Sequence, residues 1–223
     1  MIRLVVDGKE IEARQGTSLL EACLESGIYI PNLCFLKGMK NPPASCRLCF
    51  VDIEGASKPV ASCRIEPGEG MVVRTDTEPV RRLQRTALRL LLSAHVANCR
   101  NCPSNKKCEL QRMVRLLGVR LKPRRYQHLG DQLPQPQEHP LLEILPSRCV
   151  LCGRCVHVCR KRNTFSLLTF ARRGFNSVIT AYGQGSPADY PCKGCLACVE
   201  ACPVSAILLK DDSPIHGATC RDL

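Results

Sequence analysis

The sequence has few of the features that mark common protein classes. It contains no Trp, five Phe and four Tyr among 223 residues, so few rings are present to fill a core or to stack on nucleic-acid bases. No apolar run reaches the length of about 18 residues that a membrane-spanning helix needs. The start, MIRLVVDGKEIEARQG, lacks the basic and apolar segments of a secretory signal. These absences predict a cytoplasmic protein without membrane insertion.

The sequence also shows no clear site for catalysis or for a nucleotide. Residues 183–188, GQGSPA, match GxGxxA formally. However, no clear βαβ strand precedes them, and Pro187 interrupts the helix start that a dinucleotide site needs. We interpret them as a loop, and no nucleophile–base arrangement stands out elsewhere. We therefore expect no catalytic residues and no substrate site in this chain.

Cysteine is the abundant exception, with 17 residues. Because 17 is odd, disulfide pairing cannot use them all, and clustered cysteines in the cytoplasm more often bind metal. The net charge of +12 also has one location, since residues 81–125 hold 13 basic residues and 1 acidic residue. Residues 1–80 hold 9 basic and 11 acidic residues, and residues 126–223 hold 10 basic and 8 acidic residues. Such a basic segment fits a nucleic-acid surface, an acidic partner subunit or buried negative charge.

The first 78 residues predict a small mixed α/β unit. The alternating segments IRLVV and KEIEA flank a DG pair, which is a strong hairpin signal, and TSLLEACLESG predicts a helix. Ser18 and Glu21 fit a capping box, and Gly27 fits the end of this helix. Cys23 shares the apolar face of the helix with leucines, so we expect it in the core and not as a ligand.

Two helical pieces are expected between residues 78 and 118. Pro79 suits the first helical position of EPVRRLQRTALRLLLSAH, and CELQRMVRLLG forms the second piece. Arg81, Arg85 and Arg89 form a stripe of like charge, which is either a solvated face or a docking surface for acidic groups. The expected core face consists of Val80, Leu83, Ala87, Leu90, Leu91 and Ala94.

The remainder of the chain divides by composition and repetition. Residues 122–147 contain five prolines and little periodicity, which is typical of a linker. Residues 148–210 contain two similar cysteine motifs. The sequence therefore predicts five segments: 1–78, 79–121, the linker 122–146, 147–210, and the tail 211–223.

Fifteen cysteines and one histidine fall into four groups by spacing, leaving Cys23 and Cys220 outside. The groups are Cys34, Cys46, Cys49 and Cys63; His95, Cys99, Cys102 and Cys108; Cys149, Cys152, Cys155 and Cys159; and Cys192, Cys195, Cys198 and Cys202.

The last two groups give the strongest signal. Zinc normally takes two separated CxxC pairs, whereas CVLCGRCVHVC and CKGCLACVEACP present three close cysteines and a fourth further on. That pattern suits an iron–sulfur cube, and in two-cluster ferredoxins the fourth cysteine of each motif ligates the other cluster. The rule assigns Cys149, Cys152, Cys155 and Cys202 to one 4Fe–4S cluster, and Cys159, Cys192, Cys195 and Cys198 to another.

The first group has one close pair, Cys46 and Cys49, with Cys34 and Cys63 further away on either side. Taken alone, this pattern also fits zinc. After a hairpin, a helix and a long loop it suits a 2Fe–2S ferredoxin-like domain, in which amides of the ASCRLC loop would hydrogen-bond to cluster sulfurs.

The second group, HVANCRNCPSNKKC, stands between the 2Fe–2S motif and the two ferredoxin motifs. This order resembles the N-terminal iron–sulfur region of the complex I large subunit and of electron-bifurcating FeFe hydrogenases. It also resembles the small diaphorase subunit of NAD-reducing NiFe hydrogenases. A lone histidine near cysteines is more often incidental, but three cysteines leave a four-iron cluster one ligand short. The resemblance, which runs from Leu4 to Leu209, implies that His95, Cys99, Cys102 and Cys108 hold a third 4Fe–4S cluster.

The expected fold is therefore α+β in three parts. These are a β-grasp 2Fe–2S ferredoxin-like domain, a small helical 4Fe–4S domain with His and three Cys ligands, and a two-cluster 4Fe–4S ferredoxin-like domain. Four such clusters carry about −7 in total, which would offset much of the basic excess and weakens the nucleic-acid interpretation. We expect neither the molybdopterin-like domain of complex I nor a hydrogenase H-cluster region within these 223 residues.

The expected function is electron transfer through one 2Fe–2S and three 4Fe–4S clusters, in a hetero-oligomer without nucleic acid. The resemblance places FMN and NAD(P) only in partner subunits. The expected partners are a flavoprotein that oxidises NAD(P)H, a thioredoxin-like 2Fe–2S subunit and a hydrogenase. Formate dehydrogenase is the alternative catalytic partner, and a metal-containing nucleic-acid-binding or regulatory protein is the alternative of another class. The sequence leaves open the terminal partner, the direction of electron flow, electron bifurcation, the cluster potentials and the choice of NAD or NADP.

Overall fold

The structure, a computed structural model, describes residues 1–122, 139–163, 166–181, 192 and 194–210. The chain forms two compact units, Met1–Leu91 with Met113–Pro123 and Leu92–Arg112 with Arg124–Leu223. The predicted loop at 183–188, the tail, Cys220 and most of the predicted linker lie outside the described residues. The five-segment division of the sequence stays a prediction beside these two units.

A mixed five-stranded sheet forms the base of the first unit, in the order β2-β1-β5-β3-β4. β1 and β5 run parallel, and the other neighbouring strands run antiparallel. The strands are β1 (Ile2–Val6), β2 (Lys9–Ala13), β3 (Phe50–Ile53), β4 (Val60–Ala61) and β5 (Met71–Arg74). Asp7 and Gly8, the two residues between β1 and β2, both have positive φ, at 50° and 79°. This is the conformation of a two-residue primed hairpin turn, so the predicted hairpin is confirmed.

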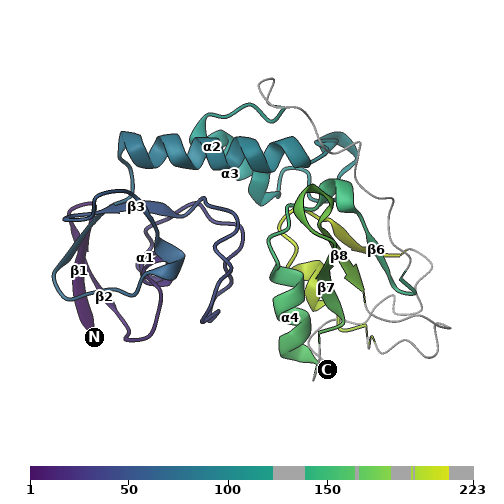
Figure 1. Cartoon of the computed structure of the whole chain (residues 1–223), viewed down its shortest axis with the longest axis horizontal. Coiled ribbons are helices and arrows are strands. Elements are labelled where there is room, and N and C mark those ends of the chain that lie inside the picture. The colour runs from purple at the N-terminus through teal and green to yellow at the C-terminus, as the bar shows by residue number, and fades with distance from the viewer. Residues whose placement is uncertain (123–138, 164–165, 182–191, 193, 211–223) are drawn as a thin grey trace. The chain divides into compact units, whose positions relative to one another are not determined.

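Helix α1 (Leu19–Glu25) packs its apolar face against this sheet (Figure 1). The Ser18 hydroxyl accepts the amide hydrogen of Glu21 at 3.2 Å, and Gly27 has a positive φ of 76° just after the helix, so both predicted ends are confirmed. The buried Glu21 carboxylate does not complete the capping box in the predicted way. It accepts the amide hydrogen of Gly38 at 3.0 Å, which ties the loop that carries Cys34 to the helix.

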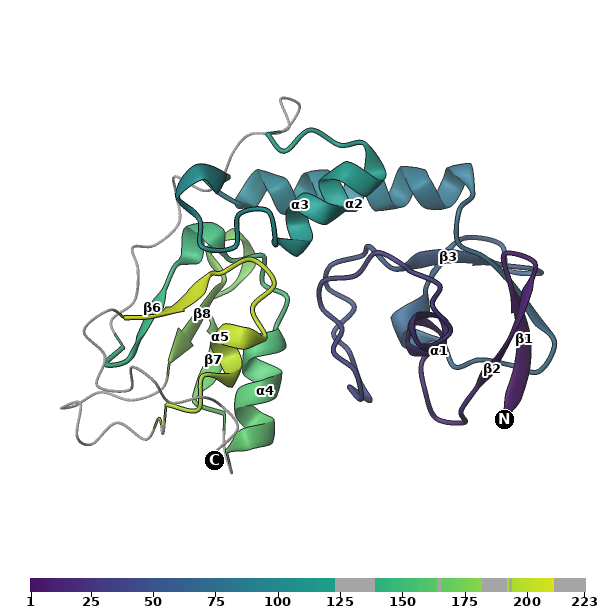
Figure 2. The same cartoon turned by 180° about the vertical axis from the view of Figure 1, so that it is seen from behind.

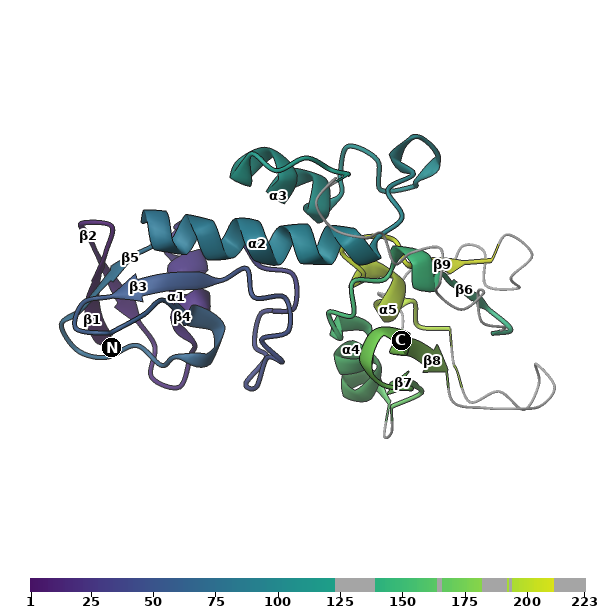
Figure 3. The ribbon, with the colours of Figure 1, turned by 45° about the horizontal axis from the view of Figure 1, so that its top comes forward.

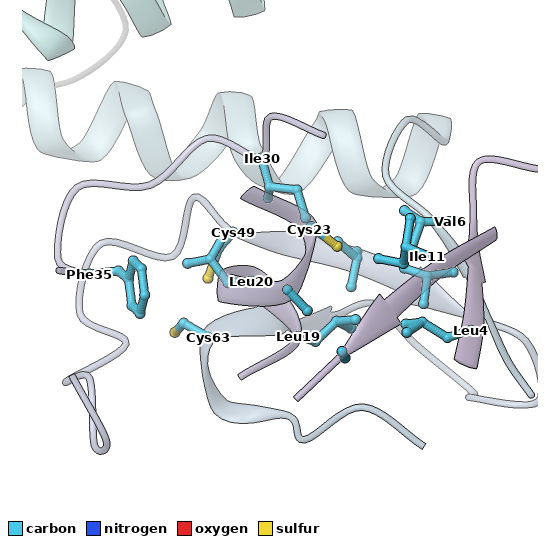
Figure 4. Packing of buried hydrophobic residues seen from close by; sticks show 14 of the residues in the cluster. Leu4, Val6, Ile11, Leu19, Leu20, Cys23, Ile30, Phe35, Cys49 and Cys63 are labelled. Carbon is cyan, nitrogen blue, oxygen red and sulfur yellow. The ribbon is translucent and has the colours of Figure 1, made fainter. Parts of the chain in front are cut away.

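The core between α1 and the sheet contains Cys23 together with leucines and isoleucines (Figure 4). Cys23 is 0% exposed, and burial raises the pKa of its thiol to about 12. In Figure 4 it lies on the far side of Leu20 from Cys63. The prediction that Cys23 is a core residue is therefore confirmed.

Helix α2 (Glu78–Ala94) buries a different stripe from the predicted one. Val80 and Ala87 are buried as expected, but Leu83 and Leu90 are 37% and 54% exposed. Leu88 and Leu92 are buried instead, together with the polar Gln84, whose side-chain amide donates to the Phe50 carbonyl at 3.1 Å. The prediction of a helix was correct, but the predicted buried face was wrong. Gln84 lies on the buried face because its side-chain amide has a hydrogen-bond partner there, whereas the prediction placed only apolar residues on that face.

Two arginines of the predicted docking stripe contact their own unit. Arg81 forms an ion pair with Asp76, with 2.5 Å between Nη2 and Oδ2. Arg85 donates from Nε to the carbonyl of Leu117 at 3.0 Å. Leu117 is the last residue of α3 (Glu109–Leu117), where a basic side chain satisfies an open helix carbonyl. These contacts favour a structural role for Arg81 and Arg85.

In the part of the second unit after residue 138 that the structure describes, two antiparallel strand pairs lie with the helices α4 (Arg154–Arg162) and α5 (Ala197–Glu200). β6 (Leu142–Ile144) pairs with β9 (Ile207–Leu209), and β7 (Leu168–Ala171) pairs with β8 (Val178–Ala181). Figure 2 shows α5 beside α4, and Figure 3 shows β9 beside β6. The core between these elements combines aliphatic side chains with Cys155, Cys159 and Cys198. No described helix has the length and apolar composition to cross a membrane.

Candidate metal centres

The four cysteines of the first group lie buried in the segments between α1 and β3 and directly after β4. Cys34, Cys46 and Cys49 precede β3, and Cys63 lies in the short 3-10 helix Ser62–Arg64. The sulfurs of Cys34 and Cys46 are 3.4 Å apart, and Figure 4 shows Cys49 and Cys63 close together beside Phe35. The fold thus brings the predicted 2Fe–2S ligands to one region of the first unit.

The loop around Cys46 turns its backbone amides toward the thiols. Ala44 and Arg47 have left-handed φ values of 51° and 52°, which non-glycine residues adopt at a cost. The amide of Ser45 hydrogen-bonds to Cys34, and the amide of Leu48 hydrogen-bonds to Cys46. Amide donors to sulfur stabilise the negative charge of thiolates and of clusters. The hydrogen bonds predicted from this loop to the sulfurs of a cluster stay a prediction.

Hydrogen bonds between the thiols prepare this site for a positively charged group. The hydrogen bond between the Cys34 and Cys46 sulfurs lowers the pKa of Cys34 to about 6. In the same way the Cys63 thiol lowers the pKa of Cys49, whereas the pKa values of Cys46 and Cys63 are raised. Metal binding would displace the protons that these thiols carry.

The second group combines buried and half-buried ligands. His95 and Cys108 are buried, while Cys99 and Cys102 are half-buried on and after the 3-10 helix Cys99–Asn101. Burial raises the pKa of Cys108, and the neighbouring Cys102 and Cys99 raise it further. The three cysteines are thus close enough to interact electrostatically, as ligands of one group would be.

His95 is oriented by a backbone carbonyl. It is 8% exposed, and its Nδ1–H donates to the carbonyl of Arg148 at 2.8 Å. In metal-binding histidines one ring nitrogen commonly donates in this way, which fixes the tautomer and leaves the lone pair on the other nitrogen. The contact with the Arg148 carbonyl therefore sets the tautomer in which Nε2 carries the lone pair.

The His95 loop is held against both ends of the ferredoxin-like region. The amide of Val96 donates to the carbonyl of Ser147 at 2.8 Å, next to the Arg148 contact of His95. At the other end the Cys108 sulfur lies 3.9 Å from the Pro203 carbonyl, and the hydroxyls of Ser104 and Ser205 hydrogen-bond to each other. Arg148 directly precedes Cys149, and Pro203 directly follows Cys202. The second group therefore borders one of the ferredoxin-type groups.

The eight ferredoxin-type cysteines line two separate cavities in the second unit. Each cavity contains three cysteines from one motif and the fourth cysteine of the other motif. One is lined by Cys149, Cys152, Cys155 and Cys202, and the other by Cys159, Cys192, Cys195 and Cys198. The structure thus brings together, in two cavities, the crossed sets that the two-cluster rule predicts.

The two motifs repeat the same backbone conformation. Leu151 and Gly194, each two residues after the first cysteine, are left-handed with φ values of 51° and 69°. Gly153 and Leu196, two residues further on, are left-handed at 75° and 54°. The amide of Leu151 donates a hydrogen bond to the Cys149 sulfur at 3.4 Å. The amide of Gly194 donates to the Cys192 sulfur in the same way. This repeated turn accounts for three sulfurs facing one cavity.

Burial dominates the protonation of the cavity thiols. It raises the pKa values of Cys149 and Cys198 to about 12 and raises those of Cys155 and Cys192 as well. Thiolates in such surroundings need a cation, so the donor set and the burial both fit a cationic iron–sulfur core. Among the sixteen described cysteines none forms a disulfide. Within the described ranges, no three or more His, Cys, Asp or Glu side chains form a site for a single metal ion.

Two polar residues at the second cavity were not predicted from the sequence, because they belong to no spaced motif. His139 lines the cavity, and burial, with a smaller effect of Lys210, lowers the pKa of its imidazole to about 4. Asn163 donates from its side-chain amide to the Cys159 sulfur at 3.6 Å. No sequence signal marks His139, whereas Asn163 stands four residues after Cys159, at the end of α4.

Comparison with known families supports the sequence-based resemblance. Residues 1–78 match the 2Fe-2S iron-sulfur cluster binding domain, and residues 84–122 match the NADH-ubiquinone oxidoreductase-G iron-sulfur binding region. A solved structure of an NAD⁺-reducing NiFe hydrogenase in the H2-reduced state is similar with a TM-score of 0.81 and 29% identity. That match covers 96% of this chain and 89% of the other.

Three curated relatives are longer proteins that this chain matches over nearly all of its own length. They are the NADP-reducing hydrogenase subunit HndD of Solidesulfovibrio fructosivorans (32% identical), the alpha subunit of the NADPH-Fe(3+) oxidoreductase of Geobacter sulfurreducens (32%) and a G-type subunit of the NADH-quinone oxidoreductase of Rhizobium meliloti (34%). The matches cover 93%, 94% and 93% of this chain and span 36%, 24% and 24% of the relatives. The chain therefore carries a 2Fe–2S cluster-binding domain followed by an iron–sulfur binding region of the NADH-ubiquinone oxidoreductase-G type, and it resembles the iron–sulfur parts of NAD(P)-linked hydrogenases and complex I.

Proposed function

We propose that this chain is an electron-transfer subunit that holds one 2Fe–2S and three 4Fe–4S clusters, one of them with His95 as a ligand. The ligand sets are the four groups defined above, with the two ferredoxin motifs crossed. Iron–sulfur clusters accept and release single electrons, and the protein sets their spacing, potential and insulation. The proposed fold is a β-grasp domain, then a helical region with His and three Cys ligands, then a two-cluster ferredoxin-like region. The mixed sheet with α1 packed against it supports the β-grasp domain.

The observation that carries the proposal is that the three ligand groups proposed for 4Fe–4S clusters in the second unit are neighbours in a series. His95 binds the backbone directly before Cys149, and Cys108 lies against the residue directly after Cys202. Helix α4 then joins the two cavities, since Cys155 lines one cavity and Cys159, about one helical turn away, lines the other. Sites in such a series suit the passage of electrons.

Several observations favour electron transfer over the alternatives. The named relatives include an NADP-reducing hydrogenase and an NADH-quinone oxidoreductase, and the similar structure is an NAD⁺-reducing hydrogenase. Arg81 and Arg85, in the basic segment, have partners within their own unit, which weakens the nucleic-acid-binding alternative. The two ferredoxin-type cavities together collect eight thiols for iron–sulfur groups.

The proposed setting is a cytoplasmic hetero-oligomer, in which cysteines stay reduced. Its expected members are a flavoprotein that oxidises NAD(P)H, a thioredoxin-like 2Fe–2S subunit and a hydrogenase, with formate dehydrogenase as the alternative catalytic subunit. FMN and NAD(P) would bind to those partners. The support for a hydrogenase is the names of two of the similar proteins.

The test compares the isolated chain with the complex that purifies with it under anaerobic conditions. In the complex we expect NAD(P)H to bleach the visible iron–sulfur absorbance and to produce the EPR signals of reduced clusters. The isolated chain should be reduced by dithionite but not by NAD(P)H, because the proposal places FMN in a partner subunit. Direct reduction of the isolated chain by NAD(P)H, or no reduction within the complex, would contradict the proposal.

A further inference from the structure

The cavity lined by Cys159, Cys192, Cys195 and Cys198 also contains a buried histidine. His139 is 3% exposed and lies just before β6. It belongs to none of the four ligand groups, and its cavity already has four thiols. Its place beside them raises the question of what its ring contributes to a cluster held there.

Backbone hydrogen bonds fix the tautomer of His139. The amides of Leu141 and Leu142 both donate to its Nδ1, each at 3.1 Å. A nitrogen that accepts two hydrogen bonds carries no proton, so the neutral ring carries its proton on Nε2. The ring is thus a neutral donor held in one orientation at the cavity wall.

The sister cavity has no comparable side chain among its described lining residues. Besides its four cysteines it is lined by aliphatic residues and Gly153. Its cysteine sulfurs accept backbone amides, from Leu151 to Cys149 at 3.4 Å and from Ala206 to Cys202 at 3.1 Å. The cavity of His139, by contrast, also has the side-chain amide of Asn163 on the Cys159 sulfur. The two ferredoxin-type sites are therefore similar in ligands but unequal in side-chain donors.

We propose that His139 donates a hydrogen bond from Nε2 to a sulfur of the 4Fe–4S cluster bound by Cys159, Cys192, Cys195 and Cys198, and thereby raises the reduction potential of that cluster. A donor stabilises the reduced cluster more than the oxidised one, because reduction adds negative charge to the sulfurs. His139 is thus a positioning and tuning residue, not a ligand. The inference rests on the proposed assignment of this cluster to these four cysteines.

The substitutions His139→Asn and His139→Gln separate this role from support of the backbone. Asn keeps a short acceptor for the amides two and three residues ahead, as in an Asx turn, but has no donor at the position of Nε2. Gln reaches further and restores an amide donor near that position. His157→Asn is the matched control, because His157 lies on α4 two residues from both Cys155 and Cys159 and lines neither described cavity.

The measurement is an anaerobic redox titration of the full holo-chain followed by EPR, with iron content determined for each variant. The signal of this cluster is identified as the one that Cys195→Ser alters. For His139→Asn we expect the ratio of reduced to oxidised cluster at a fixed potential to fall roughly three- to tenfold, the effect of one net hydrogen bond. The upper value corresponds to a midpoint about 59 mV more negative. His139→Gln should recover part of the shift, and His157→Asn should show none.

An unchanged midpoint in His139→Asn with full iron content would overturn the inference and leave the proposed function intact. Equal shifts of all clusters would also overturn it, since the effect would then be general. A wild-type chain without this cluster would overturn both the inference and the proposed function.

Discussion

Replacing His95 by cysteine tests the most unusual of the proposed cluster ligands. The change removes the hydrogen bond from Nδ1 to the Arg148 carbonyl, which is 2.8 Å long and joins a residue that is 8% exposed. Loss of such a bond costs about 1 kcal/mol of unfolding free energy. A thiolate can still complete a four-iron cluster, so we expect His95→Cys to keep its iron with a modest loss of stability.

The larger effect is on the reduction potential. Cysteine thiolate adds one negative charge to the cluster that neutral imidazole did not carry. Two unit charges about 4 Å apart interact by about 4 kcal/mol at an effective dielectric constant of about 20. A free-energy difference of about 1.36 kcal/mol changes an equilibrium constant tenfold, and a tenfold change shifts a one-electron midpoint potential by about 59 mV. The interaction therefore corresponds to roughly 170 mV. Because the charge spreads over the cluster, we expect a midpoint lower by on the order of 100 mV.

The assay is an EPR-monitored redox titration of the anaerobic holo-chain and of His95→Cys, with iron and sulfide measured in both. One 4Fe–4S signal should change shape and move to lower potential, while the other signals keep their midpoints. Cys23→Ala serves as the control for a cysteine change away from the proposed ligands. If His95→Cys leaves every signal and midpoint unchanged, His95 is not a ligand and the reasoning fails.

Three further changes test the fold and the ligand assignment. Cys23→Ala should leave the iron content unchanged and lower the unfolding free energy on the order of 1 kcal/mol, measured by iron analysis and denaturant titration; loss of iron would make Cys23 a ligand. Ser18→Ala removes the hydroxyl that accepts from Glu21 and should cost about 1 kcal/mol in a denaturant titration, whereas an unchanged midpoint would argue against the cap. Gly153→Ala forces a side chain into φ +75° with its Cβ 3.3 Å from Phe170. It should therefore lower the melting temperature, with strain of about 1–2 kcal/mol, and a wild-type melting curve would contradict this turn.

Local signals in the sequence were enough to predict much of the first unit. The DG pair predicted the hairpin between β1 and β2, because the turn needs positive φ at both positions. Ser18 and Gly27 predicted the ends of α1 for similarly local reasons. Cysteine spacing predicted the four groups, and the structure places the eight ferredoxin-type cysteines in two cavities with the crossed sets.

Features that depend on distant contacts could not be predicted from the sequence. The buried stripe of α2 is rotated because Gln84 finds a partner in Phe50, 34 residues away, and no periodicity shows such a partner. His139 and the His95–Arg148 contact join segments that the sequence separates. Close packing of residues 92–112 with the ferredoxin-like region likewise depends on single contacts such as Val96 with Ser147.

The metal and sulfide content of the full chain, purified without oxygen, shows directly whether the chain holds the proposed clusters. One 2Fe–2S and three 4Fe–4S clusters predict a brown protein with about 14 iron and about 14 acid-labile sulfide per chain. A colourless protein with about four zinc and no sulfide would contradict the account, because zinc sites contain no inorganic sulfide.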